Sequence, residues 1–189
     1  KLFEIYGTQL KFGAYEGYGI NKDKLKDLLL FKSSKEEKMV TLAEYVSRMV
    51  EGQEDIYYAN GETIDKIKGL PQVESVLNKG YEILYLTENV DEFVLQVMME
   101  YNGKKFKNVC ADNIDVGTEE EREALKKLNE DNKEMLDVMK EAISADEQDI
   151  KFTNRLTKHP VCLTTEGGLS IEMAKTINNQ IGNEDAVKA

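Results

Sequence analysis

One histidine and one thiol lie close together near the C-terminal end of this chain, and they are the first candidates for chemistry. His159 is the only histidine and precedes Cys162 by three residues, in the run His159-Pro160-Val161-Cys162. A nucleophilic thiol needs a base within hydrogen-bonding reach and a third group that orients the base. Because the sequence specifies neither contact, we interpret the pair as a histidine in a surface turn and a small buried cysteine. We assign no catalytic residue.

Metal sites are not indicated either. One histidine and two distant cysteines, Cys110 and Cys162, cannot supply the four ligands of a usual zinc site. The acidic residues form three clusters, at Asp91-Glu92, at Asp112 and Asp115, and at Glu119–Glu121. None matches the D-x-[DN]-x-[DN]-G loop that binds calcium, and clustered acids in an acidic chain are usually solvated. We therefore expect no metal ion, and solvated surface at all three clusters.

A nucleotide site is the third possibility, because ligands of α/β proteins bind where parallel strands end. The first strand-to-helix turn, residues 58–63, contains one glycine, whereas a phosphate-cradling loop needs several. The pattern GxxxxGK[ST] does not occur. One enzyme hypothesis stays open: a stand-alone α/β enzyme that binds a nucleotide or a metabolite at the strand ends near Tyr58 and Leu86. The residues themselves indicate no cofactor.

Residues 41–58, TLAEYVSRMVEGQEDIYY, show how the elements that position such sites alternate. Thr41 and Glu44 form a T-x-x-E capping box that starts a helix, and Gly52 marks its end. The β-prone run at 56–59 then predicts a strand. Four apolar residues at helical spacing predict the buried face of the helix: Leu42, Tyr45, Val46 and Met49.

The order of the predicted elements favours an α/β fold. Strands joined by helical segments call for right-handed crossovers and a small, mostly parallel, three-layer sheet. Helices are predicted at 41–51, 63–77 with a break at Gly69-Leu70-Pro71, and 90–101; strands are predicted at 56–59, 82–86 and 106–110. Tyr57 and Tyr58 then point to opposite faces of their strand. Two further helices, at 2–13 and 21–29, form a helical layer before this unit.

We divide the chain into a small helical segment (residues 1–38), an α/β subdomain (39–111), a linker (112–118) and a second, α+β domain (119–189). The second domain begins with a long helix, Glu119 to Ile143, whose apolar stripe is interrupted by Asn132. Alternation at 150–156 and a β-prone run at 161–165 predict a short sheet or hairpin. Arg48 and Arg155 lie among acids and are interpreted as structural ion-pair partners.

Composition limits the function classes. Hydrophobic residues make up 41% of the chain and charged residues 32%, which is typical of a globular protein. The net charge of −11 argues against nucleic acid or an anionic membrane as a partner. No apolar run approaches the ~20 residues that span a bilayer. Two unpatterned cysteines fit a reducing compartment, so we expect a cytoplasmic protein. Because the chain starts without Met, we expect a piece of something longer.

The last predicted helix carries a thin apolar stripe. Leu169, Met173 and Ile177 are spaced at i, i+4 and i+8, between polar flanks and after Gly167-Gly168. Such a stripe is usually core. A methionine-containing stripe on a helix behind a glycine hinge also suits adaptable binding of other proteins. Both readings stay open at this point.

Three segments resemble the heat shock protein 90 family of molecular chaperones. Thr41 to Glu62 resembles the family pattern L-x-[DE]-Y-x-x-R-M-x-E-x-Q-x-x-I-Y-Y-x-x-[GA]-[ED] in the middle domain. Lys79 to Val109 resembles the following K-G-x-E-[VI]-[LI]-x-[ML] strand, the [ID]-E helix and the [EF]-x-G-K-x-[FL] turn. Asn154 to Pro160 resembles the N-R-L-x-x-x-P run early in the C-terminal domain. The chain is thus similar to the end of a middle domain and the start of a C-terminal domain.

The resemblance implies a fragment of an ATP-dependent chaperone that binds unfolded or partly folded client proteins. ATP and Mg bind, in the family, to a domain that this chain lacks, and the arginine that contacts the γ-phosphate lies before Lys1. The fragment is therefore expected not to be an enzyme and to hold no cofactor. The family's homodimer contacts lie after Ala189, so a monomer is expected. By the same resemblance, Leu169, Met173 and Ile177 match apolar client-binding positions, whereas Thr176 departs from them.

Overall fold

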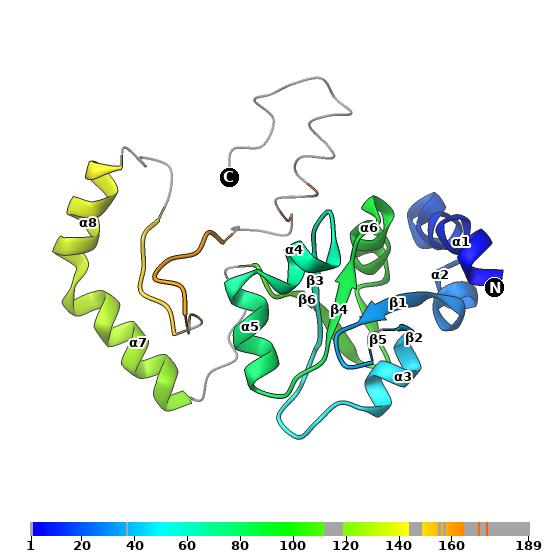
Figure 1. The fold of residues 1–189 in the computed structure, drawn as a ribbon, viewed down its shortest axis with the longest axis horizontal. Coiled ribbons are helices and arrows are strands. Elements are labelled where there is room, and N and C mark those ends of the chain that lie inside the picture. The colour runs from blue at the N-terminus through cyan, green and yellow to red at the C-terminus, as the bar shows by residue number, and fades with distance from the viewer. Residues whose placement is uncertain are drawn as a thin grey trace.

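The computed structural model describes residues 2–36, 38–111, 119–143, 149–154, 156, 158–164, 170 and 173. Residues 2–111 form an α/β unit, and two helices and an irregular segment follow it (Figure 1). The proposed linker, residues 112–118, lies outside the described residues. The division of the chain into domains therefore stays a prediction.

The described strands form one mixed sheet in the order β2-β1-β4-β3-β6-β5. Its central strands, β4, β3 and β6, run parallel, as the alternation of helices and strands predicts. Three strands that the sequence analysis missed extend the sheet antiparallel at its two edges: β1, β2 and β5. The strands span β1 Leu30–Ser33, β2 Met39–Thr41, β3 Ile56–Asn60, β4 Ile83–Leu86, β5 Glu100–Tyr101 and β6 Lys104–Asn108.

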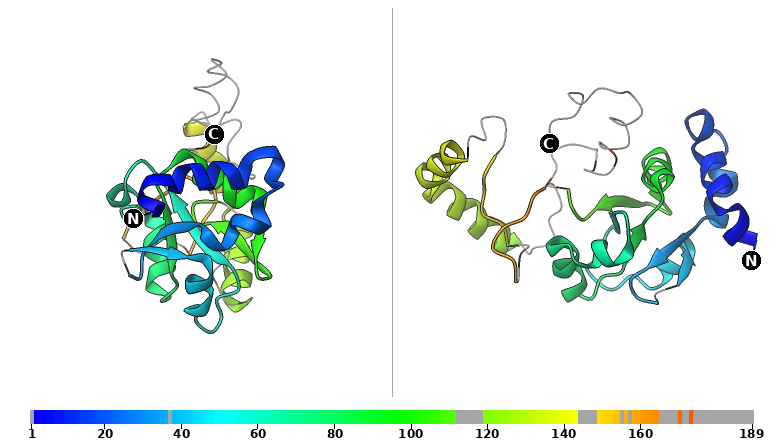
Figure 2. Two further views of the ribbon diagram at one scale, coloured as in Figure 1. Left: turned by 90° about the vertical axis from the view of Figure 1, so that its right-hand side faces the viewer. Right: turned by 45° about the horizontal axis from the view of Figure 1, so that its top comes forward.

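Helices cover both faces of this sheet, which confirms the α/β class (Figure 2). One core contains residues of α1, α3 and α6 together with Tyr58, and the other contains residues of α4 and α5 together with Tyr57. The two neighbouring tyrosines therefore point to opposite faces, as predicted. The helices are α1 Leu2–Gly19, α2 Lys22–Leu25, the 3₁₀ turn η1 Lys26–Leu28, α3 Leu42–Ser47, α4 Ile64–Lys68, α5 Pro71–Asn78, α6 Asn89–Met98, α7 Glu119–Asp131 and α8 Lys133–Ala142.

The signals that start a helix behave as the sequence predicts at α3 and α5. The Thr41 hydroxyl accepts the Glu44 N–H at 3.1 Å, and the Glu44 carboxylate accepts the Thr41 N–H at 2.7 Å, so the capping box of α3 is formed. α3 ends at Ser47, earlier than Gly52 indicates. The break between α4 and α5 is confirmed, with Pro71 in the first turn of α5.

The N-terminal layer differs from its prediction. The sequence predicts that Leu25, Leu28 and Leu29 form the buried stripe of the second helix, yet Leu28 is 55% exposed and a strand, β1, begins at Leu30. Pairing of β1 with β4 explains the difference, because sheet hydrogen bonds to a distant strand override weak local preference.

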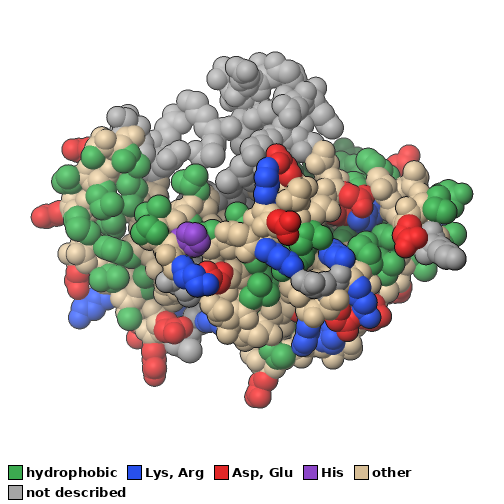
Figure 3. Space-filling view, viewed as in Figure 1, with side chains coloured by type: hydrophobic (Ala, Val, Ile, Leu, Met, Phe, Trp, Pro, Cys, Tyr) green, Lys and Arg blue, Asp and Glu red, His purple; other side chains and the backbone are tan. Residues whose placement is uncertain are grey.

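The second half is helical where the long helix is predicted, but it is split at Asn132 into α7 and α8. The apolar stripe that was expected to be buried is mostly exposed to solvent, because among the described residues of both helices only Leu136 is buried. Figure 3 shows hydrophobic side chains gathered over these helices. The exposed ones include Leu128, Met135, Val138, Met139 and Ile143. The predicted sheet is not formed by the described residues of 149–164, which contain no strand.

Candidate functional site at the carboxyl ends of the parallel strands

Tyr45 is a buried residue of α3 that links the starts of two parallel strands, β3 and β4. The Tyr45 hydroxyl donates to the Glu82 carbonyl oxygen at 2.6 Å, accepts the Tyr57 N–H at 2.9 Å and accepts the Gln53 side-chain amide at 2.8 Å. Tyr45 is fully buried, and burial raises the pKa of its hydroxyl. The neutral phenol therefore links α3 to the starts of β3 and β4.

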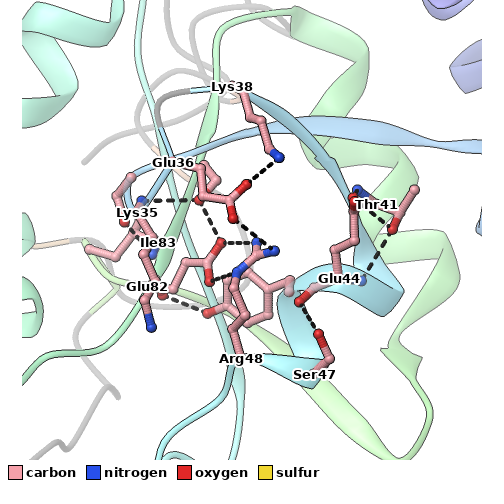
Figure 4. A network of polar contacts seen from close by, with 12 residues as sticks. Lys35, Glu36, Lys38, Thr41, Glu44, Ser47, Arg48, Glu82 and Ile83 are labelled. Carbon is pink, nitrogen blue, oxygen red and sulfur yellow. Dashed lines mark hydrogen bonds and ion pairs between the residues drawn. The ribbon is translucent and has the colours of Figure 1, made fainter.

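Arg48, the residue that follows α3, points at the Glu82 side chain (Figure 4). Its Nε lies 3.0 Å from Glu82 Oε2 and its Nη2 lies 2.7 Å from Glu82 Oε1, and Glu36 Oε1 is 3.7 Å from Nη1. The Glu82 side chain is 1% exposed, so this carboxylate depends on Arg48 for charge compensation. The structural role predicted for Arg48 is confirmed, and Arg155 lies outside the described residues.

Asp91 and Glu92 are buried, 3% and 4% exposed, so the expectation of a solvated face there is wrong. Lys11 of α1 is 1% exposed, and its Nζ lies 2.5 Å from Asp91 Oδ1 and 3.1 Å from Glu88 Oε1. Burial raises the pKa of Asp91, and the Lys11 ammonium opposes this shift. The buried pair holds the start of α6 against α1.

With α6 held in this way, Glu92 faces the ends of two parallel strands. Its Oε1 accepts the Tyr58 hydroxyl at 3.3 Å and the Asn108 side-chain amide at 3.4 Å. Its Oε2 accepts the Asn60 side-chain amide at 2.9 Å. The Asn108 amide also reaches Asn60 Oδ1, at 3.3 Å. Burial, followed by the nearby Glu92 carboxylate, raises the pKa of Tyr58, so the tyrosine stays a neutral donor.

A residue from the C-terminal part of the chain completes this group. The Ser170 hydroxyl donates to Glu92 Oε2 and accepts the Asn60 side-chain amide at 2.7 Å. Ser170 is 4% exposed. We call these five residues the Glu92 cluster: Tyr58, Asn60, Glu92, Asn108 and Ser170. It is one of the points at which the described C-terminal residues join the α/β unit; another is the Gln72 side-chain amide, which donates to the Leu163 carbonyl oxygen at 2.8 Å.

The cluster is suited to holding a chain segment. Tyr58 and Leu86, named in the enzyme hypothesis, are 5% and 2% exposed. Two surface hollows, of about 380 and 370 Å³, lie elsewhere and include neither residue. The space at the strand ends is filled by the protein's own side chains.

The other chemical candidates lie at or close to the surface. His159 is exposed, as predicted, and Cys162 is partly buried. Glu119–Glu121 are exposed, which confirms a solvated face, whereas Asp112 and Asp115 lie outside the described residues. Among the described residues no three His, Cys, Asp or Glu side chains are grouped so that they could hold a metal ion.

Of the three apolar positions proposed for client binding, the structure describes one. Met173 is 4% exposed, and its sulfur accepts the Gln96 side-chain amide at 3.3 Å. In this arrangement the Met173 side chain faces α6 and is closed to solvent. Leu169 and Ile177 lie outside the described residues, so binding of a client to the stripe stays a prediction.

The burial of the acidic pair Asp91-Glu92 could have been found in part from the sequence. Asp91, Leu95 and Met98 lie at i, i+4 and i+7, which places the first acid of the pair on the apolar face of α6. That spacing predicts burial of Asp91, but the sequence analysis gave more weight to the acidic composition of the chain, which predicts a solvated surface. No local pattern connects Glu92 with Ser170, since the two are 78 positions apart.

Comparison with known proteins agrees with the fold and with the motifs. The sequence model of the family described as Hsp90 protein matches residues 1–189. The chain is 50% identical to chaperone protein HtpG of Clostridium perfringens (strain 13) over 189 residues, which is 100% of this chain and 30% of that protein. It is 50% identical to HtpG of Oceanobacillus iheyensis over 178 residues, 94% of this chain and 28% of the relative. The chain therefore spans about 30% of the length of these curated relatives.

A solved structure from the same family is similar to this chain as well. The chain resembles the middle domain of a Plasmodium falciparum heat shock protein with a TM-score of 0.53 and 29% sequence identity, over 57% of this chain and 46% of that one. None of the helices in the described parts of the chain has the length and hydropathy needed to cross a membrane. With a family match over its whole length and half of its residues identical to HtpG chaperones, this chain belongs to the Hsp90 protein family.

Proposed function

We propose that this chain is a section of an ATP-dependent molecular chaperone, in which it couples neighbouring domains and contributes contacts to unfolded or partly folded client proteins. Membership of the Hsp90 family and the identity to HtpG chaperones support the proposal. One structural observation carries the coupling role. Ser170 contacts Glu92 from beyond the proposed linker, in the interior of the molecule.

A buried contact of this kind is suited to transmitting a change of domain position. Glu92 accepts donors from β3, from β6 and from Ser170 through one carboxylate. Hydrogen bonds to a buried charge are about twice as strong as neutral ones, and losing one leaves the charge poorly compensated. A movement of Ser170 would therefore change the hydrogen bonds of Glu92 at the carboxyl ends of the central strands.

ATP and Mg bind, in this proposal, to another part of the longer protein, and the homodimer contacts also lie elsewhere. The chain itself works as a monomeric, cytoplasmic section without a cofactor. The competing hypothesis, an enzyme with its site near Tyr58 and Leu86, is not favoured, because both residues are buried by their own neighbours.

The proposal is tested on this chain with two assays. Fluorescence anisotropy of a labelled protein that is held unfolded by reduction and alkylation of its disulfides measures client contact, and the native, oxidised form of the same protein is the matched competitor. We expect the unfolded form to compete and the folded form not to. Titration with MgATP and a phosphate-release assay should show neither binding nor turnover. Equal competition by both forms would contradict client contact, and nucleotide turnover would favour the enzyme hypothesis.

A further inference from the structure

The sequence contains two Asn-Gly pairs, Asn60-Gly61 and Asn102-Gly103, and the structure holds them in different ways. An asparagine that precedes glycine is prone to deamidation, because glycine has no side chain to shield its backbone nitrogen. That nitrogen attacks the side-chain carbonyl carbon of the asparagine. The reaction therefore needs an asparagine side chain that can turn and a glycine nitrogen that is not held in a hydrogen bond.

Asn60-Gly61 meets neither condition. The Asn60 side-chain amide donates to Glu92 Oε2 at 2.9 Å, and its Oδ1 accepts the Asn108 amide at 3.3 Å. The Gly61 N–H donates to the Leu86 carbonyl oxygen at 3.1 Å. Both reacting groups are thus held in place by the folded α/β unit, and the bond to Glu92 involves a buried charge.

Asn102-Gly103 is the two-residue turn between β5 and β6, and both residues are exposed. Their φ values of +51° and +74° are those of a type I′ hairpin turn. In the described part of the chain the Gly103 N–H has no hydrogen-bond acceptor, and the Asn102 amide has one hydrogen-bonding neighbour, the Tyr101 hydroxyl. Strand β5 contains two residues at the edge of the sheet, so the turn opens at low cost.

We propose that Asn102 is a deamidation site of the folded chain and that the Glu92 cluster protects Asn60 from the same reaction. The Gly103 nitrogen forms a C–N bond with the Asn102 side-chain carbonyl carbon. The side-chain nitrogen then leaves as ammonia, together with the proton of the Gly103 amide. Water opens the resulting cyclic succinimide at either of its two carbonyls, which gives aspartate or isoaspartate at this position.

The products alter the end of the β5–β6 hairpin. Either one places a carboxylate beside the Tyr101 hydroxyl, which already donates to Asp27 Oδ1 at 2.6 Å. Isoaspartate also adds a carbon atom to the backbone of the turn, and a two-residue turn joins its strands only in a defined geometry. The reaction therefore adds a negative charge and distorts the hairpin at the edge of the sheet.

The test is incubation of the chain at mildly alkaline pH, followed by mass spectrometry of the peptides that contain each asparagine. The same chain unfolded in guanidinium chloride is the reference, and there both pairs should react at comparable rates. In the folded chain Asn102 should keep a rate close to its reference rate. Asn60 should react at least about tenfold more slowly than in the reference, because opening its site breaks a hydrogen bond to a charged group.

Gly103→Ala is the matched variant, since its methyl group shields the attacking nitrogen. It should slow the reaction at Asn102 and leave Asn60 unchanged, and the unsubstituted chain should yield isoaspartate as well as aspartate. Equal rates for the two asparagines in the folded chain would overturn the proposal, as would an Asn102 that the folded turn protects as strongly as Asn60. Aspartate as the sole product, or an unaltered rate in Gly103→Ala, would mean direct hydrolysis by water and would also overturn it.

Discussion

The Arg48 guanidinium donates two hydrogen bonds, 3.0 Å and 2.7 Å long, to the Glu82 carboxylate. The Glu82 side chain is 1% exposed and the Arg48 side chain is 20% exposed. Removing the guanidinium leaves a buried carboxylate without that charge compensation. We predict that Arg48→Ala lowers the free energy of unfolding by about 2–4 kcal/mol, measured by urea denaturation. The control is Lys66→Ala, which breaks the exposed pair with Glu62 and should change it by less than about 0.5 kcal/mol. Equal effects would show that burial does not distinguish the two pairs.

Tyr45→Phe removes one hydroxyl from three buried partners. The Glu82 carbonyl, the Tyr57 N–H and the Gln53 amide each lose a hydrogen bond, while the packing of the ring is retained. We expect a loss of about 1–3 kcal/mol in the free energy of unfolding. Tyr18→Phe, at a side chain that is 98% exposed, should stay within about 0.5 kcal/mol of the unsubstituted chain. A neutral Tyr45→Phe would mean that water replaces the hydroxyl.

The raised pKa of Asp91 predicts a pH dependence with a definite sign. Below its ordinary value of 3.8 the carboxyl is protonated in both the folded and the unfolded state. As the pH rises through the raised folded pKa, the folded state must ionise a buried group, so the contribution of Asp91 to stability is lost. The free energy of unfolding of the unsubstituted chain, minus that of Asp91→Asn, should therefore fall from pH 3.8 upward and then level off.

Urea denaturation of both proteins between pH 3.5 and 7 measures this difference. A difference that rises with pH would show that the Lys11 ammonium outweighs burial and lowers the pKa of Asp91.

Gly19 meets two constraints at once. Its φ is +82°, and a Cβ there would lie 2.3 Å from Val97 Cγ1, a β-branched side chain that cannot turn away easily. Gly19→Ala should cost about 2–4 kcal/mol of the free energy of unfolding, from backbone strain and from overpacking. Gly103 has a φ of +74° with no atom near its Cβ position, so Gly103→Ala isolates the strain and should cost about 1 kcal/mol. The free energy of unfolding of both variants is measured by thermal and by urea denaturation. An equal loss in Gly19→Ala and in Gly103→Ala would rule out a steric contribution at Gly19.

Local patterns predicted the elements whose cause is local. The capping box at Thr41 and Glu44 starts α3, Pro71 restarts α5, and alternation sends Tyr57 and Tyr58 into different cores. The central parallel strands follow from the order of helices and strands. These features depend on side chains within a few positions of one another, so one sequence is enough to identify them.

Features that depend on distant partners were missed. Strand β1 exists because Lys32 and Ser33 pair with Tyr85 and Leu84, and nothing near Leu30 announces that pairing. The apolar stripe of α8 predicted burial, yet Met135 is 46% exposed, because no packed layer of described residues covers that face. Whether an apolar helix face is buried depends on the element that packs against it, and the periodicity of the helix does not predict that element.

The sequence by itself determined the family, the α/β class and the absence of zinc-like or phosphate-cradling motifs, because residue types and short spacings carry that information. Only the tertiary structure decided that Asp91 and Glu92 are buried. The Lys11 ammonium and the donors from Asn60, Asn108 and Ser170 reach these acids from elements far along the chain. A carboxylate is stable in the interior when such partners replace water, and their convergence exists only in three dimensions.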